Sequence, residues 1–397
     1  MGKKKETKAL LISAMLDDHF PLLKHAFASR RYHPVEILSR REGVVDLGLR
    51  YAHNDMCYPF ILSLGQMLDA LGSGDWDPAQ TALLMPTAGD ACRGANFPSL
   101  LRKAMEMAGY PDVRVLTLNV KGLGRQASLP ITPEMIWKAL FGLLYGDILL
   151  LLTHQTRPYE VRSGDVMACR NRWMERLSRD LEKGKHLTLG RMRRNFRAMA
   201  EEFASIPRTN GKRQRIALVG EVYTKYCAAG NWDLVSYLEE AGCEAVVNGF
   251  SWYILYYFDS QLAESRGPAR LLWQAGSALL ARSQKAMLRA LSDQGFSALP
   301  PFHAFKDQAE KYISLDLRVA DGWLIGGEIV AHLNAGCDKV LAVQPFGCLP
   351  GHVCGRGQYP ALIRRLGRGK LVSVDTDSSG SRAAFYNRVR LLLDMPS

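Results

Sequence analysis

The sequence predicts an α/β fold with two parallel sheets, and three observations lead to that prediction. Short, continuously apolar runs alternate with helical stretches, which is typical of strands that are buried on both faces. Several of the helical stretches end in glycine at a plausible C-cap. A strand-free region from 131 to 206 separates two such alternating halves. We therefore expect two doubly wound, Rossmann- or flavodoxin-like domains with a helical insert between them.

The apolar runs have the length of strands and the segments between them have the pattern of helices. The clearest helical segments are 97–109, 231–242 and 327–336, and each of them ends in Gly. The candidate strands are Thr81–Pro86, Val113–Val120, Arg215–Glu221, Glu244–Gly249, Lys339–Pro345 and Leu371–Asp375.

The middle of the chain reads as helix throughout, and a polar segment with Pro, Asn and Gly, 205–215, follows it. Such composition is typical of a boundary between domains. The predicted domains are an N-terminal α/β domain at 1–130 with Cys57 and Cys92, a helical insert at 131–206, and a C-terminal α/β domain at 207–397 with Cys348.

The composition is that of a globular protein, with 397 residues, 47% hydrophobic and 23% charged residues. A formal net charge of +12 favours acidic partners, but the basic residues are scattered and no nucleic-acid reader motif is present, so we do not expect nucleic-acid binding. The N-terminus is charged and then only briefly apolar, unlike a secretory signal. The best membrane candidate, Ala139–Leu152, is short and contains Asp147, so we expect a buried helix, no membrane and a cytoplasmic protein with reduced thiols.

Three of the eight cysteines lie in loops close to predicted helix starts. Ligands of doubly wound sheets bind beyond the carboxyl ends of the strands, where Cys92 and Cys348 fall; Cys57 directly precedes a helical stretch. A helix N-terminus favours thiolate, and three thiolates can hold a [4Fe-4S] cluster with one iron left open. The spacing is dispersed, with no compact CxxC.

The other cysteines are open to a simpler interpretation, because free cysteine is often inert packing in a core. We expect that for Cys169, Cys227, Cys243 and Cys337, whereas Cys354, six residues past Cys348, is ambiguous. Glu328 and His332 are four residues apart and are more often an ordinary surface pair than metal ligands. The sequence contains no P-loop, no GxGxxG after a strand, no HExxH and no GxSxG.

Several segments resemble the 2-hydroxyacyl-CoA dehydratase family, and in particular a poorly characterised branch associated with an activator ATPase. They are NDMCYP, GDACRG, TRPYEVRSGD, RIALVGEVYTKYCAAGNWDLVSYLEEAGCE and GGEIVAHLNAGCDKVLAVQPFGCLPGHVCGRG, in this order from about residue 45 onward. QPFGCLPGH is the most specific of them.

The resemblance implies an iron–sulfur protein in which Cys57, Cys92 and Cys348 hold a [4Fe-4S] cluster between α/β domains. It also implies a dimeric iron–sulfur ATPase that delivers a low-potential electron, and a homodimer or a heterodimer with a related subunit. In the dehydratases the electron forms a ketyl radical from an acyl-CoA thioester, which then eliminates hydroxide. Some relatives hold a double-cubane cluster, [8Fe-9S], for which Cys354 and Cys227 are the best additional ligands here.

The sequence contains no CoA-binding signature that we can identify, so the substrate is less well defined than the cluster. His53 and His352 flank the expected ligands and are weak candidates for catalytic groups, equally compatible with a loop-structural role. The alternatives are a double-cubane reductase of small molecules, a non-catalytic electron-transfer or cluster-scaffold protein, or a zinc-stabilised binding protein of the same fold.

Overall fold

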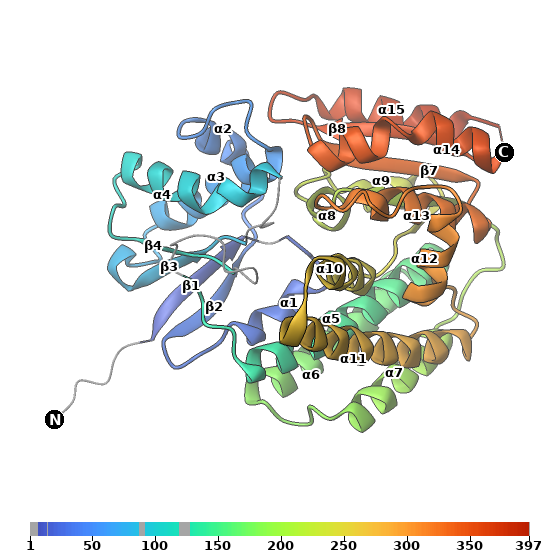
Figure 1. The fold of residues 1–397 in the computed structure, drawn as a ribbon, viewed down its shortest axis with the longest axis horizontal. Coiled ribbons are helices and arrows are strands. Elements are labelled where there is room, and N and C mark those ends of the chain that lie inside the picture. The colour runs from blue at the N-terminus through green and yellow to red at the C-terminus, as the bar shows by residue number, and fades with distance from the viewer. Residues whose placement is uncertain (1–6, 14, 87–91, 119–127, 397) are drawn as a thin grey trace.

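The computed structural model describes residues 7–13, 15–86, 92–118 and 128–396, and it contains two four-stranded, all-parallel sheets (Figure 1). The first sheet has the order β2-β1-β3-β4 and the second the order β6-β5-β7-β8, so both follow the same 2-1-3-4 pattern. The predicted α/β class with two doubly wound sheets is confirmed. The strands are β1 (Lys8–Ser13), β2 (Tyr32–Ile37), β3 (Thr81–Leu84), β4 (Arg114–Leu116), β5 (Gln214–Gly220), β6 (Cys243–Val246), β7 (Lys339–Pro345) and β8 (Lys370–Thr376).

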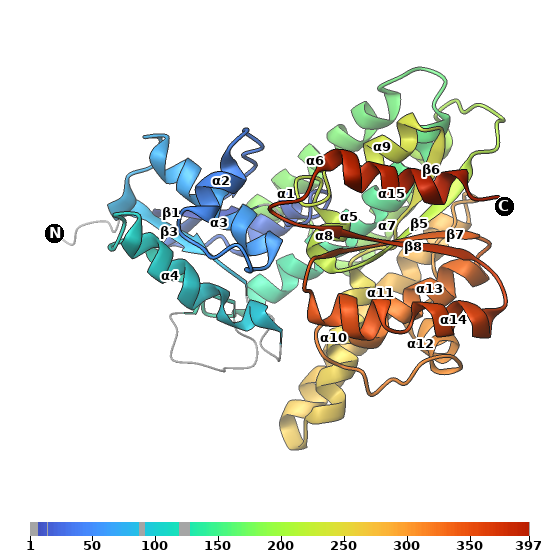
Figure 2. The same cartoon turned by 90° about the horizontal axis from the view of Figure 1, so that it is seen from above.

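Helices pack on the faces of both sheets. In Figure 2, α9 and α15 lie on one side of the second sheet and α13 and α14 on the other. The helices of the N-terminal part are α1 (Phe20–Leu23), α2 (Val44–Leu49), α3 (Tyr58–Gly72) and α4 (Phe97–Met107). Those that follow are α5 (Pro133–Thr156), α6 (Asp165–Lys183), α7 (Leu189–Ala204), α8 (Val222–Tyr226), α9 (Leu234–Glu240), α10 (Ser251–Glu264), α11 (Gly267–Ser292), α12 (Phe302–Glu310), α13 (Gly322–Asn334), α14 (Tyr359–Leu366) and α15 (Arg382–Asp394).

Glycines end three of these helices as the sequence predicts. Gly109, Gly242 and Gly336 follow α4, α9 and α13 with φ of +86°, +80° and +81°. A side chain is strained in this left-handed conformation, and glycine is not. The predicted helix ends at these three places are therefore confirmed.

The sequence did not predict β1 and β2, although β1 lies in the middle of the first sheet. The strand β1 has the residues KALLIS, whose apolar stretch directly follows a charged N-terminus. The strand β2 contains Pro34, which cannot donate to a ladder, and it is accordingly an edge strand. The predicted strand Val113–Val120 is shorter in the structure, where β4 covers Arg114–Leu116; residues 119 and 120 are outside the described residues.

Helices α5, α6 and α7 lie between the two sheets in the sequence, but they share a continuous hydrophobic core with the second sheet. Leu144, Ile148 and Phe196 belong to the same buried cluster as Leu218 and Leu341. A helical insert that forms a unit of its own is therefore not confirmed, and the predicted three-domain division stays a prediction.

The long helix α5 is buried, as predicted for the apolar stretch around Leu149. It is longer than that stretch, and its most apolar window, with a mean hydropathy of 1.8, would suffice to cross a membrane by length and composition. However, 83% of the window is buried inside the protein. These are the properties of a core helix.

Asp147, the acidic residue within α5, has a structural role in this core. Its side chain is fully buried and lies 2.7 Å from Nε2 of His19. It also accepts hydrogen bonds from the backbone N–H groups of Phe250 and Ser251, at 2.6 and 3.1 Å, where α10 begins. Free N–H groups at a helix start need such an acceptor when they are buried. Asp147 thus connects the N-terminal part of the chain, α5 and α10.

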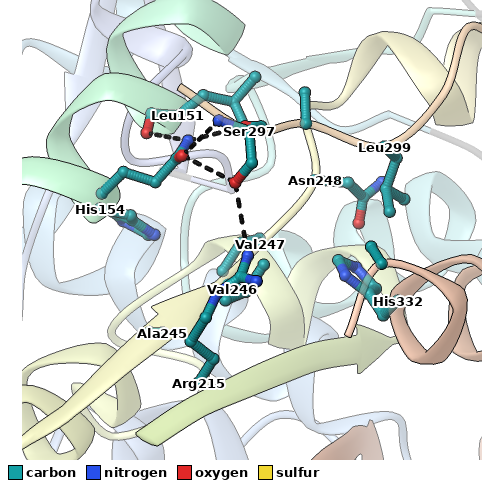
Figure 3. A pocket seen from close by; sticks show the side chains of 13 residues that line it. Leu151, His154, Arg215, Ala245, Val246, Val247, Asn248, Ser297, Leu299 and His332 are labelled. Carbon is teal, nitrogen blue, oxygen red and sulfur yellow. Dashed lines mark hydrogen bonds between the residues drawn. The ribbon is translucent and has the colours of Figure 1, made fainter. Parts of the chain in front are cut away.

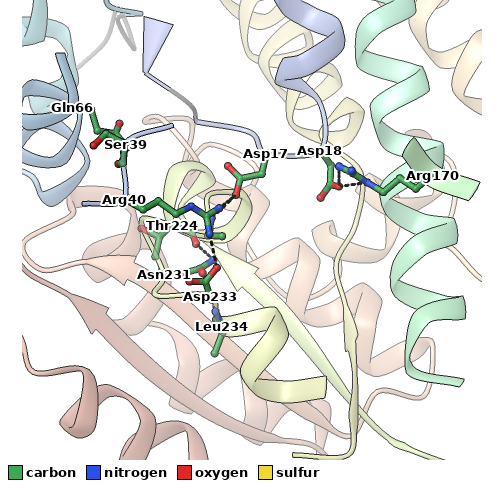
Figure 4. A network of polar contacts seen from close by, with 11 residues as sticks. Asp17, Asp18, Ser39, Arg40, Gln66, Arg170, Thr224, Asn231, Asp233 and Leu234 are labelled. Carbon is green, nitrogen blue, oxygen red and sulfur yellow. Dashed lines mark hydrogen bonds and ion pairs between the residues drawn. The ribbon is translucent and has the colours of Figure 1, made fainter. Parts of the chain in front are cut away.

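A polar network joins the first sheet to the second part of the molecule (Figure 4). Arg40, which follows β2, lies 2.8 Å from Asp233 and 3.4 Å from Asp17. Asp17 in turn accepts a hydrogen bond from the N–H of Ala228 at 2.9 Å, and Asp18 pairs with Arg170 of α6 at 2.7 Å. These contacts hold the carboxyl ends of β1 and β2 against the second part of the chain.

Candidate functional site

The carboxyl ends of β3 and β7 lead to two of the three loop cysteines, Cys92 and Cys348. In a sheet of order 2-1-3-4, the strands in the first and third chain positions flank the point where the winding direction reverses, which is the usual ligand site. Cys92 follows β3 in the first sheet, and Cys348 follows β7 in the second. Each cysteine therefore lies at the expected ligand end of its own sheet.

Cys57 is the N-cap of α3, and its carbonyl accepts the first hydrogen bonds of this helix from Phe60 and Ile61. Pro59 occupies the first turn, where its missing N–H costs nothing. The cysteine is thus at the positive end of a helix of 15 residues, as predicted.

Cys92 is the N-cap of a short 3₁₀ helix, η3 (Arg93–Asn96), that leads into α4. Its sulfur accepts a hydrogen bond from the N–H of Gly94 at 3.4 Å. The residues between Met85 and Cys92 include 87–91, which lie outside the described residues.

Cys348 precedes η5 (Pro350–Arg356), a turn of π-helix. Its sulfur accepts a hydrogen bond from the N–H of Gly351 at 3.4 Å. A Cβ on Gly351 would lie 2.8 Å from Cβ of Gln344 and 3.3 Å from the sulfur, so glycine is required for this close approach. Turns of π-helix are rare in proteins, and those that do occur are often at functional sites.

One guanidinium group joins the three cysteine loops. Arg93, next to Cys92, donates a hydrogen bond of 2.6 Å to the carbonyl of Asp55 and one of 3.3 Å to the carbonyl of Gly347. Asp55 is two residues before Cys57, and Gly347 directly precedes Cys348. The structure thus brings together, at one place between the two sheets, the backbones of the three loops that the sequence singles out.

The thiols of these loops are close enough to influence one another. Burial raises the pKa of the Cys57 thiol, and the nearby Glu221 and Cys92 raise it further, whereas Arg93 lowers it. The pKa of Cys348 is likewise raised by burial and by Glu221, with a contribution from Cys57. Cys57 is therefore near enough to interact electrostatically with each of the other two cysteines. Cys348 is buried, and Cys57 and Cys92 are partly exposed.

Within the described ranges, no three His, Cys, Asp or Glu side chains converge tightly enough to bind a single metal ion. A cubane cluster places a different demand on the protein, because each thiolate binds a different iron. The donor set fits such a cluster in three respects: three thiols on three loops, backbone N–H groups on two of the sulfurs, and a glycine at the point of closest packing.

Cys227 and Cys354 lie beside this site. Cys227 is fully buried in a small apolar cluster with Tyr58, Leu62 and Tyr223, and burial raises the pKa of its thiol to about 12. Cys354 lies in η5, is 8% exposed, and has a thiol pKa that is raised by burial and by Asp321. The cysteines expected in the core are buried in the structure: Cys169, Cys227, Cys243 and Cys337.

The two candidate histidines differ in their surroundings. His53 is largely exposed, with Nδ1 at 3.3 Å from Asp55. His352 is partly buried, and its Nε2 lies 3.2 Å from Asp375. Asp375 also accepts hydrogen bonds from Arg356 and Gln344, so this network fastens η5 to the ends of β7 and β8. The contact of His352 with Asp375 therefore gives this histidine a structural role in holding η5 in place.

A group of charged residues near the cysteine loops is largely buried, and the sequence did not predict it. Lys225 lies 2.6 Å from Glu328 and 3.3 Å from Oδ1 of Asn248, and the side chains of the ion pair are each 1% exposed. Asp321 is also buried and Glu221 is partly buried, and desolvation raises the pKa of both carboxyl groups. The position of Glu221 and Lys225 directly after β5 was the available signal, since polar residues at the carboxyl end of a central strand often line a site.

Glu328 and His332 are not the surface pair that the sequence suggested. Both are 1% exposed, because α13 is buried on all sides. His332 borders a cavity of about 30 Å³ together with His154, Arg215 and Asn248 (Figure 3). A cavity of that size has room for about one water molecule, which makes it too small for a substrate.

Because two buried histidines border this cavity, we expect the stability of the protein to depend on pH. Burial lowers the pKa of His154 to about 4 and that of His332 to about 3, from 6.5. Below pH 6.5 the unfolded chain binds protons that the folded protein does not, so acid favours unfolding. We expect the free energy of unfolding to fall by about 2–3 kcal/mol per histidine between pH 6.5 and about 4.5.

Urea unfolding at a series of pH values measures this loss. His332→Leu should reduce the loss, and the same substitution at the exposed His303 should not. If the free energy of unfolding changed with pH equally in wild type and in His332→Leu, the lowered pKa of His332 would be contradicted.

Comparison with known protein families and with curated proteins returned no match to this chain.

Proposed function

We propose that this chain is an iron–sulfur protein in which Cys57, Cys92 and Cys348 hold a [4Fe-4S] cluster between the two sheets. The observation that carries the proposal is the joining of the three cysteine loops by Arg93, which binds the carbonyls of Asp55 and Gly347. Arg93 thereby holds together three segments that are far apart in the sequence and that each carry a cysteine.

Such a cluster, when bound, supplies one-electron reduction together with a Lewis-acidic iron that lacks a protein ligand. The residues of the chain prepare its surroundings. The N–H groups of Gly94 and Gly351 donate to the sulfurs of Cys92 and Cys348, and hydrogen bonds to sulfur tune a reduction potential. Tyr58, the residue after Cys57, belongs to a buried apolar cluster with Leu62 and Tyr223.

We further propose that the electron comes from a dimeric, ATP-hydrolysing iron–sulfur activator, and that the reaction is reductive or radical chemistry such as the dehydration of a 2-hydroxyacyl-CoA. The resemblance of QPFGCLPGH and its companion segments to the dehydratase family supports this part. The same resemblance supports a homodimer or a heterodimer with a related subunit. A cytoplasmic location fits because thiols that form no disulfide persist in a reducing compartment.

Reduction with dithionite tests this function. Anaerobically purified protein should be brown, should lose visible absorbance on reduction, and should then give an EPR signal of a reduced cluster. A zinc-stabilised protein would be colourless and redox-silent, because Zn²⁺ has a filled d shell. Colourless protein with stoichiometric zinc would therefore exclude the proposed function and favour the binding-module alternative.

A further inference from the structure

A basic groove lies between α7 and α11, away from the cysteine loops. It has a volume of about 680 Å³. In Figure 1, α7 and α11 form the lower edge of the molecule, whereas α3 and β7 are in the upper half. Five cationic side chains line the groove: Arg193, Arg197, Arg282, Lys285 and Arg289.

The cations form two facing rows. Arg193 and Arg197 are one turn apart on α7, and residues at this spacing lie on the same face of a helix. Arg282, Lys285 and Arg289 follow each other at intervals of three and four on α11, so they form one stripe of about 10 Å along that helix. An anion in the groove would be contacted from both sides.

None of the five cations has a carboxylate partner within ion-pair distance in the part of the chain that the structure describes. Other arginines of this protein do have one, as Arg157 does with Glu239 at 2.6 Å and Arg170 with Asp18 at 2.7 Å. Asp293 is the one acidic residue that lines the groove. All five cations are exposed to solvent, and their two rows create a positive potential that an anionic ligand would neutralise.

We propose that this groove binds a polyphosphate group. Four of the five cations are arginines, whose planar guanidinium groups match phosphate oxygens in a bidentate manner. The volume is within the range of small-molecule sites. Among the described residues that line the groove, the apolar ones are Ala286 and Ala290, and none is an aromatic residue on which a nucleic-acid base would stack. Recognition therefore depends on phosphate charge, and the site is independent of the iron–sulfur proposal.

Isothermal titration of the full chain with tripolyphosphate tests the proposal. The variant Arg193→Gln/Arg197→Gln removes one row of charge. We expect it to weaken tripolyphosphate binding by about tenfold or more, because each charge-assisted hydrogen bond that is lost reduces the binding free energy. The control Arg364→Gln/Arg388→Gln removes the same charge from exposed positions on α14 and α15 and should leave the affinity within about twofold of wild type. Thermal unfolding of all proteins verifies folding.

The other outcomes overturn the proposal. Absence of measurable binding would show that the groove has no polyphosphate ligand. Equal losses of affinity in Arg193→Gln/Arg197→Gln and in the control Arg364→Gln/Arg388→Gln would mean that the net charge of the protein alone attracts the anion. A single-stranded RNA or vesicles with anionic lipid that bind the groove more tightly than tripolyphosphate, and lose this binding in Arg193→Gln/Arg197→Gln, would assign the groove to a different ligand.

Discussion

Substitution of Cys348 by Ala is expected to remove the iron–sulfur cluster almost completely while the protein stays folded. The sulfur of Cys348 is buried at the end of β7 and is held by the N–H of Gly351 at 3.4 Å. Three thiolates are the smallest set expected to retain a cubane, so loss of any one should release it. Cys57→Ala and Cys92→Ala should have the same effect. Iron content and visible absorbance of the purified variants measure it.

Cys243→Ala is the matched control, because Cys243 is also a buried free cysteine but lies at the start of β6, away from the loops. It should keep the iron content of the wild type. A Cys348→Ala protein with full iron and unchanged colour would exclude Cys348 as a ligand. If Cys227→Ala or Cys354→Ala also lost iron, the larger double-cubane cluster would be favoured.

Replacement of Lys225 by Met is expected to lower the free energy of unfolding by about 3–5 kcal/mol. The ion pair of Lys225 with Glu328 is 1% exposed on both sides, and without the lysine the carboxylate would remain buried and uncompensated. The double variant Lys225→Met/Glu328→Met should regain most of the loss, because a buried pair and apolar residues of similar volume are often of comparable stability. Urea unfolding of the wild type, of Lys225→Met, of Glu328→Met and of the double variant completes a double-mutant cycle.

A partly exposed pair provides the control for this cycle. Lys306 and Asp259 are at the same distance of 2.6 Å, but their side chains are 29% and 21% exposed. Lys306→Met should therefore cost no more than about 1 kcal/mol. Equal costs at Lys225 and Lys306 would contradict the view that burial makes the pair of Lys225 and Glu328 important for stability.

Six of the eight strands were predictable because the sheets are buried on both faces and their strands are continuously apolar. The two strands that were missed have other patterns: β1 follows a charged segment, and β2 contains Pro34. Single-sequence patterns also could not show that α5 to α7 pack into the core of the second sheet, because this depends on contacts between distant segments.

The loop cysteines of the candidate site were predictable, since they follow strands or precede helices at the expected end of a doubly wound sheet. Their convergence through Arg93 was not, because Arg93 and Gly347 are 254 residues apart. The buried position of Glu328 was missed for the same reason: its partner Lys225 is 103 residues away. Local spacing shows which helix face two residues share, and it does not show whether that face is covered.

The most direct test of the central claim is the amount of iron and acid-labile sulfide per chain in anaerobically purified protein. We expect about four of each, as for one [4Fe-4S] cluster on Cys57, Cys92 and Cys348. About eight irons would instead indicate a double cubane with additional cysteine ligands. Protein that contains no iron after anaerobic purification and after reconstitution with iron and sulfide would contradict the claim that these three loops hold a cluster.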